Sequence, residues 1–161
     1  IKPNVHEDKR GYFYENYRDE LFEENGLPTD FRQDNQTKSV KGTLRGLHYQ
    51  LKYPQGKLVR VSLGMVYDVA VDIRPESGTY KQWISVKLSA ENHRMLYIPQ
   101  GFAHGFCTLE DNSEVFYQMS TEYDSHAAAG IVWNEPGFNI EWPEMKYTIS
   151  QKDLALPSLK S

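Results

Sequence analysis

The segment VYDVAVDIR, residues 66–74, indicates the fold class of this chain more clearly than any other stretch. Its odd-numbered positions from 67 to 73 are aromatic or aliphatic, whereas positions 68, 70 and 72 are Asp, Ala and Asp. Side chains of a β-strand point alternately to its two faces, so this period of two predicts a strand. One face of that strand is apolar, and the other carries two carboxylates.

Four other segments, on both sides of this strand, have a similar strand-like composition. They are LVRVSL (residues 58–63), WISVKL (83–88), RMLYI (94–98) and EVFYQM (114–119). Groups of Gly, Pro, Asn and Asp punctuate the sequence between them at short intervals, which is typical of an all-β sandwich or barrel. We expect about nine or ten strands arranged as a cupin-like jelly-roll barrel.

Only one or two short helices are expected in this all-β fold. In residues 17–24, Tyr17, Leu21 and Phe22 lie on one side at helical spacing, and Asn25-Gly26 supplies a C-terminal stop. A second short helix or turn is expected at residues 150–154.

The length and charge of the chain limit what it can be. Its 161 residues suit one domain, expected over residues 1–161, and 13% of them are aromatic, which favours sheet. With 18 Lys and Arg against 22 Asp and Glu, the net charge of −4 argues against general nucleic-acid binding. A small anionic ligand is compatible with this charge, because one site needs only a few cations.

Sequence features of a membrane or secreted protein are missing. No apolar run approaches the roughly 20 residues of a membrane helix, and the first ten residues, IKPNVHEDKR, do not resemble a signal peptide. The single cysteine, Cys107, excludes an internal disulfide framework and a Cys-based zinc cluster. These observations favour a cytoplasmic protein without membrane contact.

Two of the five histidines lie beside glycines in strand-like segments and are the first candidates for chemistry. His104 ends IPQGFAH (residues 98–104), which fits the Pro-x-Gly-x-x-His pattern of the second cupin motif. His48 stands where the first cupin motif would begin, but Tyr49 and Gln50 provide no second histidine. Two histidines without a third protein ligand make a poor zinc or iron site, so no metal is expected. Taken alone, His104 is equally compatible with a structural role at a turn.

Several motifs follow one another along almost the whole chain: DKRGYF (residues 8–13), QDN (33–35), RGLHYQ (45–50), PQGKLVR (54–60), VYDVAVDIR (66–74), IPQGFAHGF (98–106) and SQKD (150–153). In this order they resemble the dTDP-4-dehydrorhamnose 3,5-epimerase family. The resemblance implies a cupin-type jelly roll, no cofactor, a homodimer and a dTDP-4-keto-6-deoxy sugar as substrate. Epimerisation at carbons 3 and 5 of dTDP-4-dehydro-6-deoxy-D-glucose would give dTDP-4-dehydro-L-rhamnose.

The chemistry of epimerisation fits residues that the resemblance singles out. Inverting a carbon next to a ketone requires a base, a donor or cation at the enolate oxygen, and an acid on the opposite face. By resemblance the base is His48, the carboxylate that orients it is Asp153, the enolate-stabilising cation is Lys57 and the acid is Tyr117. No spacing in the sequence links His48 to Asp153.

Six further positions match family residues that line the ligand: Arg10, Glu15, Gln33, Asn35, Arg45 and His104. The two arginines match positions at the nucleotide, whose diphosphate requires cations. In a regular strand, Arg45 and His48 would point to opposite faces. Gly46 between them allows a β-bulge that would turn both side chains toward one cavity.

Each assignment has an alternative that the sequence leaves open. Lys57 would otherwise be a solvated strand start, Tyr117 a core residue beside Val115 and Met119, and Asp153 a helix cap or solvated charge. For the whole chain, the alternatives are a single-carbon epimerase acting on a related 4-keto sugar nucleotide, a non-catalytic sugar-nucleotide-binding cupin, and a metal cupin.

The two carboxylates in the segment at residues 66–74 also have two interpretations. Asp68 and Asp72 are either neighbours of an active site or structural partners of Arg60 and Arg74. The chain departs from the family pattern in three places. It begins late, whereas family members usually carry an additional strand before this point that often contributes to the dimer. The segments MST (119–121) and HAAA (126–129) replace the residues common in the family. None of these departures removes a residue assigned to catalysis.

Overall fold

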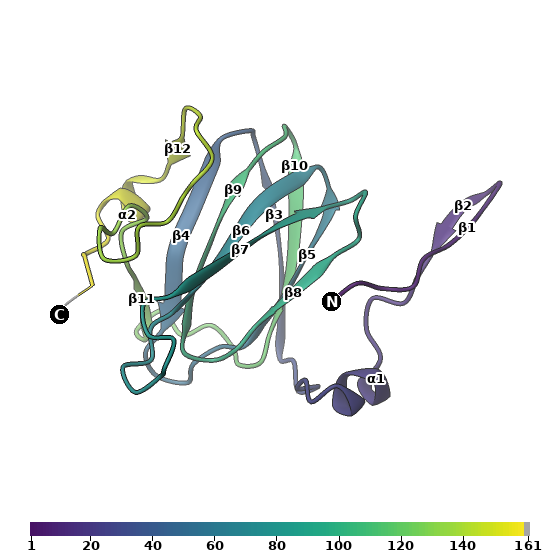
Figure 1. Cartoon of the computed structure of the whole chain (residues 1–161), viewed down its shortest axis with the longest axis horizontal. Helices are drawn as coiled ribbons and strands as arrows, with labels where there is room; N and C mark the ends of the chain where they lie inside the picture. The colour runs from purple at the N-terminus through teal and green to yellow at the C-terminus, as the bar shows by residue number, and fades with distance from the viewer. Residues whose placement is uncertain (160–161) are drawn as a thin grey trace.

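The computed structural model describes residues 1–159, which fold into two antiparallel sheets that face each other (Figure 1). The smaller sheet has the order β3 (Gln33–Ser39), β10 (Ser113–Met119), β5 (Lys57–Leu63) and β8 (Met95–Ile98). The larger sheet has the order β11 (Ala128–Gly130), β4 (Thr43–Gln50), β9 (Phe102–Thr108), β6 (Met65–Asp72) and β7 (Trp83–Ser89), and β12 (Thr148–Ile149) pairs with β4 in parallel. The predicted all-β, cupin-like jelly roll is confirmed.

Five segments predicted from composition and alternation are strands of these sheets, with ends that differ by one or two residues. The described residues contain twelve strands, above the nine or ten expected. The additional ones are short: β1 (His6–Asp8), β2 (Gly11–Phe13), β11 and β12 have three residues or fewer. Alternation cannot be recognised in segments of that length.

The strand β6 packs on both of its faces. Ala70 lies in the core between the two sheets, in one cluster with Val59 of β5. Val69 and Val71 lie on the outer face of the larger sheet, in a second cluster with Phe138 from the C-terminal segment. The apolar face predicted from the sequence is therefore covered by the C-terminal segment, and the face with the carboxylates turns toward the interior of the sandwich.

Both predicted helices are present and short. The first, α1 (Asp19–Glu24), begins two residues later than predicted, because Tyr17 instead packs its ring on Phe22 and donates its hydroxyl to the Thr29 carbonyl. Gly26 follows the helix in the left-handed region at φ 68°, as a C-terminal stop requires. The second, α2 (Gln151–Leu154), is capped by Ser150, whose Oγ accepts from the Asp153 backbone N–H at 3.0 Å.

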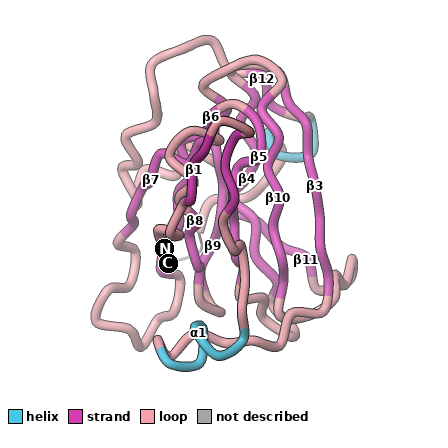
Figure 2. The backbone as a smooth tube through the Cα atoms, turned by 90° about the vertical axis from the view of Figure 1, so that its right-hand side faces the viewer, coloured by secondary structure: helices cyan, strands magenta, loops and turns pink. Residues whose placement is uncertain are grey.

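The hairpin of β1 and β2 stands apart from the sandwich as an N-terminal arm, next to the edge formed by β8 (Figure 1). Backbone hydrogen bonds between Ile1 and Met95 attach its base to that edge. Tyr12 and Phe13 on β2 are 58% and 67% exposed, although the Tyr12 ring also packs on Tyr14 and His93. In the view turned by 90°, α1 lies below the strands (Figure 2). No helix in the described part is long and apolar enough to span a membrane.

The turn after β6 is organised around one buried carboxylate. Asp72 is 1% exposed and accepts hydrogen bonds from the Arg74 side chain at 2.7 Å and from the hydroxyls of Ser77 and Thr79 at 2.6 Å. The strand therefore ends at Asp72 rather than at Arg74. The Arg74 guanidinium, with the two hydroxyls, holds the pKa of Asp72 well below its usual value, although burial opposes this shift.

We predict that Asp72→Asn lowers the free energy of unfolding at neutral pH by about 1–3 kcal/mol, because a buried acceptor of charged and hydroxyl donors is lost. A carboxyl with a lowered folded pKa stabilises the fold above its unfolded pKa, so the difference from wild type should shrink below about pH 4. Denaturant unfolding of both proteins across this range measures it. Glu76→Gln, an exposed carboxyl in the same turn, is the control; equal effects of the two substitutions would contradict the prediction.

Candidate active site

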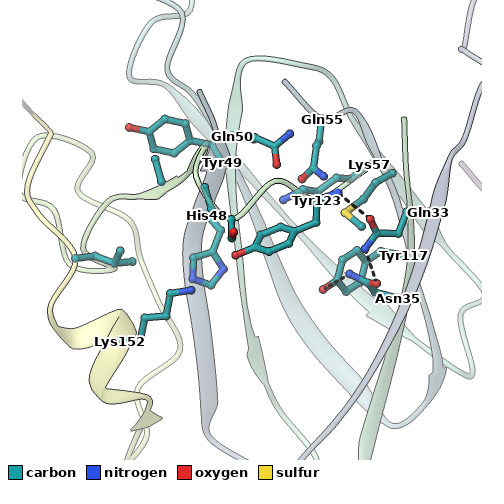
Figure 3. A pocket seen from close by; sticks show the side chains of 15 residues that line it. Gln33, Asn35, His48, Tyr49, Gln50, Gln55, Lys57, Tyr117, Tyr123 and Lys152 are labelled. Carbon is teal, nitrogen blue, oxygen red and sulfur yellow. Dashed lines mark hydrogen bonds between the residues drawn. The ribbon is translucent and has the colours of Figure 1, made fainter. Parts of the chain in front are cut away.

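A cavity of about 430 Å³ opens between the two sheets and is lined by five of the ten site residues singled out from the sequence (Figure 3). Strands β3, β5 and β10 of the smaller sheet line one side, and β4, β11 and α2 line the other. A smaller pocket of about 130 Å³ shares His48, Lys57 and Tyr117 with it and adds Arg45 and His104. The two spaces form an outer and an inner part of one site.

His48 on β4 and Asp153 on α2 form the first functional pair, although 105 residues separate them in the chain. His48 Nε2 and Asp153 Oδ1 are 2.7 Å apart; the imidazole is 43% exposed and the carboxylate only 7%. Burial would raise the pKa of Asp153, but the interaction with His48 and the hydrogen bonds from Gly46 and Ser150 together outweigh it, so the pKa lies below its usual value. The carboxylate is therefore ionised at neutral pH and fixes the ring of His48.

The expected bulge at Gly46 is present. In the register of β4 with β9, Arg45 pairs with Phe106 and His48 with His104, so β4 has one residue more than β9 between these pairs. Gly46 has a φ of 120°, and an added Cβ would lie 2.6 Å from Gly105 Cα, so a side chain is excluded on both counts. The extra residue turns Arg45 and His48 into the same inner pocket.

Lys57, the first residue of β5, is buried rather than solvated, so the alternative of an exposed strand start is wrong. It is 7% exposed, and burial lowers its pKa to about 8, against the opposing effect of the Asp68 carboxylate. A lysine in this state is an ammonium at neutral pH in a water-poor setting, where its charge acts most strongly on a neighbouring oxyanion.

Tyr117 packs against the core cluster, as its alternative interpretation predicts, and it also lines both parts of the cavity. It lies on β10 opposite Asn35 of β3, whose Nδ2 donates to the phenol oxygen at 3.4 Å. Gln33 Nε2 donates in turn to Asn35 Oδ1 at 3.1 Å, as the dashed lines in Figure 3 show. The tyrosine hydroxyl thus ends a short chain of amides along the wall opposite His48.

His104 is held by a second carboxylate rather than by a turn. Its Nε2 lies 2.9 and 3.0 Å from the two oxygens of Asp68, which is completely buried. Each of the two interpretations of the β6 carboxylates therefore holds for one residue. Asp72 is a structural partner of Arg74, whereas Asp68 lies next to the site. Arg60 instead lies over the Phe116 ring, 4.4 Å from its centre.

Arg10 and Glu15 do not reach this cavity within the chain. Arg10 is on the N-terminal arm, where it forms an ion pair with Asp8 and its side chain is 84% exposed. Glu15 lies between the arm and α1 and pairs with Arg18 at 3.5 Å. Among the described residues, no three His, Cys, Asp or Glu side chains lie close enough together to hold a metal ion.

Comparison with known proteins assigns the chain to a family. The sequence profile described as dTDP-4-dehydrorhamnose 3,5-epimerase matches residues 1–161. This chain belongs to the dTDP-4-dehydrorhamnose 3,5-epimerase family. A curated relative of that name from Shigella flexneri is 51% identical over 156 residues, which are 96% of this chain and 86% of the relative.

Two solved structures of the dTDP-4-dehydrorhamnose 3,5-epimerase family are similar over nearly their whole length. The Bacillus anthracis str. Ames enzyme, with TDP and PPi bound, is 43% identical, with a TM-score of 0.96 and coverage of 98% of this chain and 91% of that one. The dTDP-6-deoxy-D-glucose-3,5-epimerase of Legionella pneumophila, in complex with dTDP-4-keto-L-rhamnose, is 41% identical, with a TM-score of 0.93 and coverage of 99% and 92%.

Three residues lining the outer cavity of this family member were not anticipated from its sequence. Lys152 precedes Asp153 on α2 and lies near His48, Tyr123 reaches across the cavity, and Gln55 lies above Lys57 (Figure 3). Tyr123 stands in a loop without periodicity. The SQKD motif at residues 150–153 contains Lys152 beside Asp153 and was a usable signal for it, although Asp153 is buried and Lys152 is exposed.

We predict that the Lys57 ammonium titrates near pH 8, below the ordinary lysine value, when followed by NMR of its Nζ with Lys57→Met as the assignment control. The unfolded chain holds this proton up to about pH 10, so stability relative to Lys57→Met should rise between the two values as the buried charge is removed. Titration at the ordinary lysine value would contradict the burial argument.

Proposed function

We propose that this chain epimerises carbons 3 and 5 of dTDP-4-dehydro-6-deoxy-D-glucose without a cofactor, giving dTDP-4-dehydro-L-rhamnose. The observation that carries the proposal is the 2.7 Å contact between His48 and Asp153 at a cavity that also holds Lys57 and Tyr117. The isomerase activity agrees with the family of the chain. The proposed substrate class is supported by the thymidine nucleotides bound in the two similar structures.

The proposed reaction begins with proton removal beside the ketone at carbon 4. His48, neutral and oriented by Asp153, takes the proton from carbon 3 or carbon 5, and the electrons of the C–H bond form an enolate. The negative charge appears on the carbon-4 oxygen, where the buried Lys57 ammonium stabilises it. Burial serves this step because a charge in a water-poor cavity acts more strongly on the oxyanion than the same charge in water.

Inversion requires that the proton returns from the other side of the ring. His48 is on β4 of the larger sheet, and Tyr117 is on β10 of the smaller sheet, so base and acid belong to opposite walls of the cavity (Figure 3). The Tyr117 phenol donates its proton to the enolate carbon, and exchange with water then restores the phenol and the free imidazole. We assign the same two residues to both carbons, with the sugar moving between the two events.

The remaining polar groups of the cavity are assigned to the nucleotide and the diphosphate. Arg45 and Lys152 supply positive charge, and Gln33 and Asn35 supply amides. Among residues 1–159, no carboxylate lines either part of the cavity, which suits an anionic ligand. A cytoplasmic location is part of the proposal and is supported by the single, buried and unpaired thiol of Cys107.

We further propose that the chain works as a homodimer in which the N-terminal arm reaches the partner subunit. Support comes from the exposed aromatic side chains of Tyr12 and Phe13 on that arm. Arg10, which the resemblance assigns to the nucleotide, does not reach the cavity of its own chain. A partner copy that supplies this arginine would account for both observations.

We predict that His48→Ala lowers the rate of epimerisation by about 10²–10⁴-fold, because the positioned general base is lost. The measurement is NMR of the substrate in deuterated water, which follows exchange at carbons 3 and 5 separately. Exchange at only one carbon in the wild type would identify a single-carbon epimerase. His126→Ala, which removes a side chain that is 96% exposed, is the control. Exchange at the wild-type rate in His48→Ala would exclude His48 as the base.

Tyr117→Phe and Lys57→Met should separate the two halves of the reaction. Without the phenol, His48 still removes the proton and returns it to the same face, so deuterium exchange persists while inversion falls. Without the ammonium the enolate is not stabilised, and both exchange and inversion fall, with a loss of about 3–4 kcal/mol in transition-state stabilisation. Product stereochemistry and deuterium content are measured together; loss of exchange in Tyr117→Phe equal to that in Lys57→Met would refute the division.

Mixing two inactive variants tests the dimer. In a mixed dimer of Arg10→Ala and His48→Ala subunits, one site combines a native His48 with a native Arg10 from its partner. If the arm crosses to the partner, equal mixing should restore about a quarter of wild-type activity by random assortment of subunits. Light scattering gives the mass of each sample. A monomeric mass, or a mixture as inactive as its components, would contradict the arrangement.

A further inference from the structure

A second histidine–carboxylate pair lies next to the first and has no part in the reaction proposed so far. His104 on β9 is 6% exposed, and Asp68 on β6 is fully buried behind it. Both Asp68 oxygens lie within 3.0 Å of His104 Nε2. Enclosing an ionised carboxylate completely is costly unless it is hydrogen-bonded and balanced by charge, so its surroundings explain why it is there.

The contact with Asp68 determines which nitrogen of His104 the substrate meets. A carboxylate only accepts hydrogen bonds, so Nε2 carries the proton in this contact. The other nitrogen, Nδ1, makes no hydrogen bond among the described residues, and the ring lines the inner pocket. His48 and His104 are direct partners in the register of β4 with β9, so two carboxylate-held imidazoles stand side by side at that pocket.

The same carboxylate acts on Lys57 from the opposite sheet. The charged and titratable groups that line the inner pocket around Lys57 are Arg45 and His48 of β4, His104 of β9 and Tyr117 of β10. None of these is an anion at neutral pH, and the strand on the other side, β8, places Ile98 opposite Lys57. Asp153 is engaged with His48, which leaves Asp68 as the carboxylate whose charge favours the protonated lysine.

We propose that Asp68 is a positioning residue for the epimerisation, which fixes the ring of His104 toward the sugar and balances the buried charge of Lys57. This inference rests on the proposed function and adds a residue that does not touch the substrate. Asp68 holds His104 so that Nδ1 meets a hydroxyl or the keto group of the sugar. It also keeps Lys57 protonated up to the pH at which the enolate must be stabilised.

The test compares Asp68→Asn with Asp72→Asn, two isosteric changes on the same face of β6. In Asp68→Asn, Lys57 loses the negative charge that favours its protonated form, so it loses its proton at lower pH. The fall of kcat/KM on the alkaline side of its pH profile, the alkaline limb, therefore moves to lower pH. We expect kcat/KM to fall about tenfold more near pH 8.5 than near pH 6.5, together with a rise in KM from the released His104. Asp72→Asn destabilises the fold but should leave the alkaline limb in place.

A second measurement keeps the inference testable if Asp68→Asn does not fold. The double variant Lys57→Met/Asp68→Asn removes both charges, and its exchange rate is compared with that of Lys57→Met alone. If Asp68 acts through Lys57, adding Asp68→Asn to Lys57→Met costs little further exchange, no more than Asp72→Asn costs in the same Lys57→Met background. A full additive loss would overturn the inference, as would an alkaline limb that does not move.

NMR titration of Lys57 Nζ in Asp68→Asn separates this inference from the proposed function, because it needs no substrate. A lysine that titrates at lower pH than in the wild type supports the role of Asp68 even if the chain exchanges no deuterium into the sugar nucleotide. An unchanged titration overturns that role even if the wild type is a fully active epimerase.

Discussion

The hydrogen bond between His48 and Asp153 is the contact on which the site depends, and several parts of the fold exist to make it. Asp153 reaches β4 because Ser150 caps α2 and β12 pairs with β4 immediately before it. The C-terminal segment that carries them is held in turn by its apolar contacts with Val69 and Val71 on the outer face of the larger sheet. Apolar packing on the outer face of the sheet, away from the cavity, therefore helps to hold Asp153 2.7 Å from His48, although 105 residues separate them in the chain.

The charges of the site are arranged in two layers. Cations, amides and a phenol line the cavity, and the two carboxylates, Asp68 and Asp153, lie one layer behind, each against a histidine. This order attracts an anionic ligand without placing a negative charge against it. It also leaves the imidazoles oriented and the lysine protonated, which are the conditions that enolate chemistry requires.

Two of the departures from the family pattern lie at the rim of this cavity and support it locally. Ser120 Oγ accepts from the Gly56 backbone N–H at 2.8 Å, directly before Lys57, and so helps to fix the start of β5. Ala128 and Ala129 form β11 and line the outer cavity opposite β5. Small side chains there leave the cavity open where bulkier ones would narrow it.

Turn residues marked where the strands end, and alternation with a period of two indicated which side chains share a face; both are local properties of the sequence. The order of the motifs along the chain indicated the candidate chemistry. Periodicity and spacing did not determine that Asp153 meets His48, a pairing that only the family resemblance suggested. Nor did they determine that Asp68 binds His104 while Asp72 binds Arg74, or that Arg10 lies away from the cavity. These pairings depend on the order of strands in the sheets and on the bulge at Gly46, which bring distant segments together. Only the tertiary structure decided them, because local periodicity carries no information about which strand lies next to which.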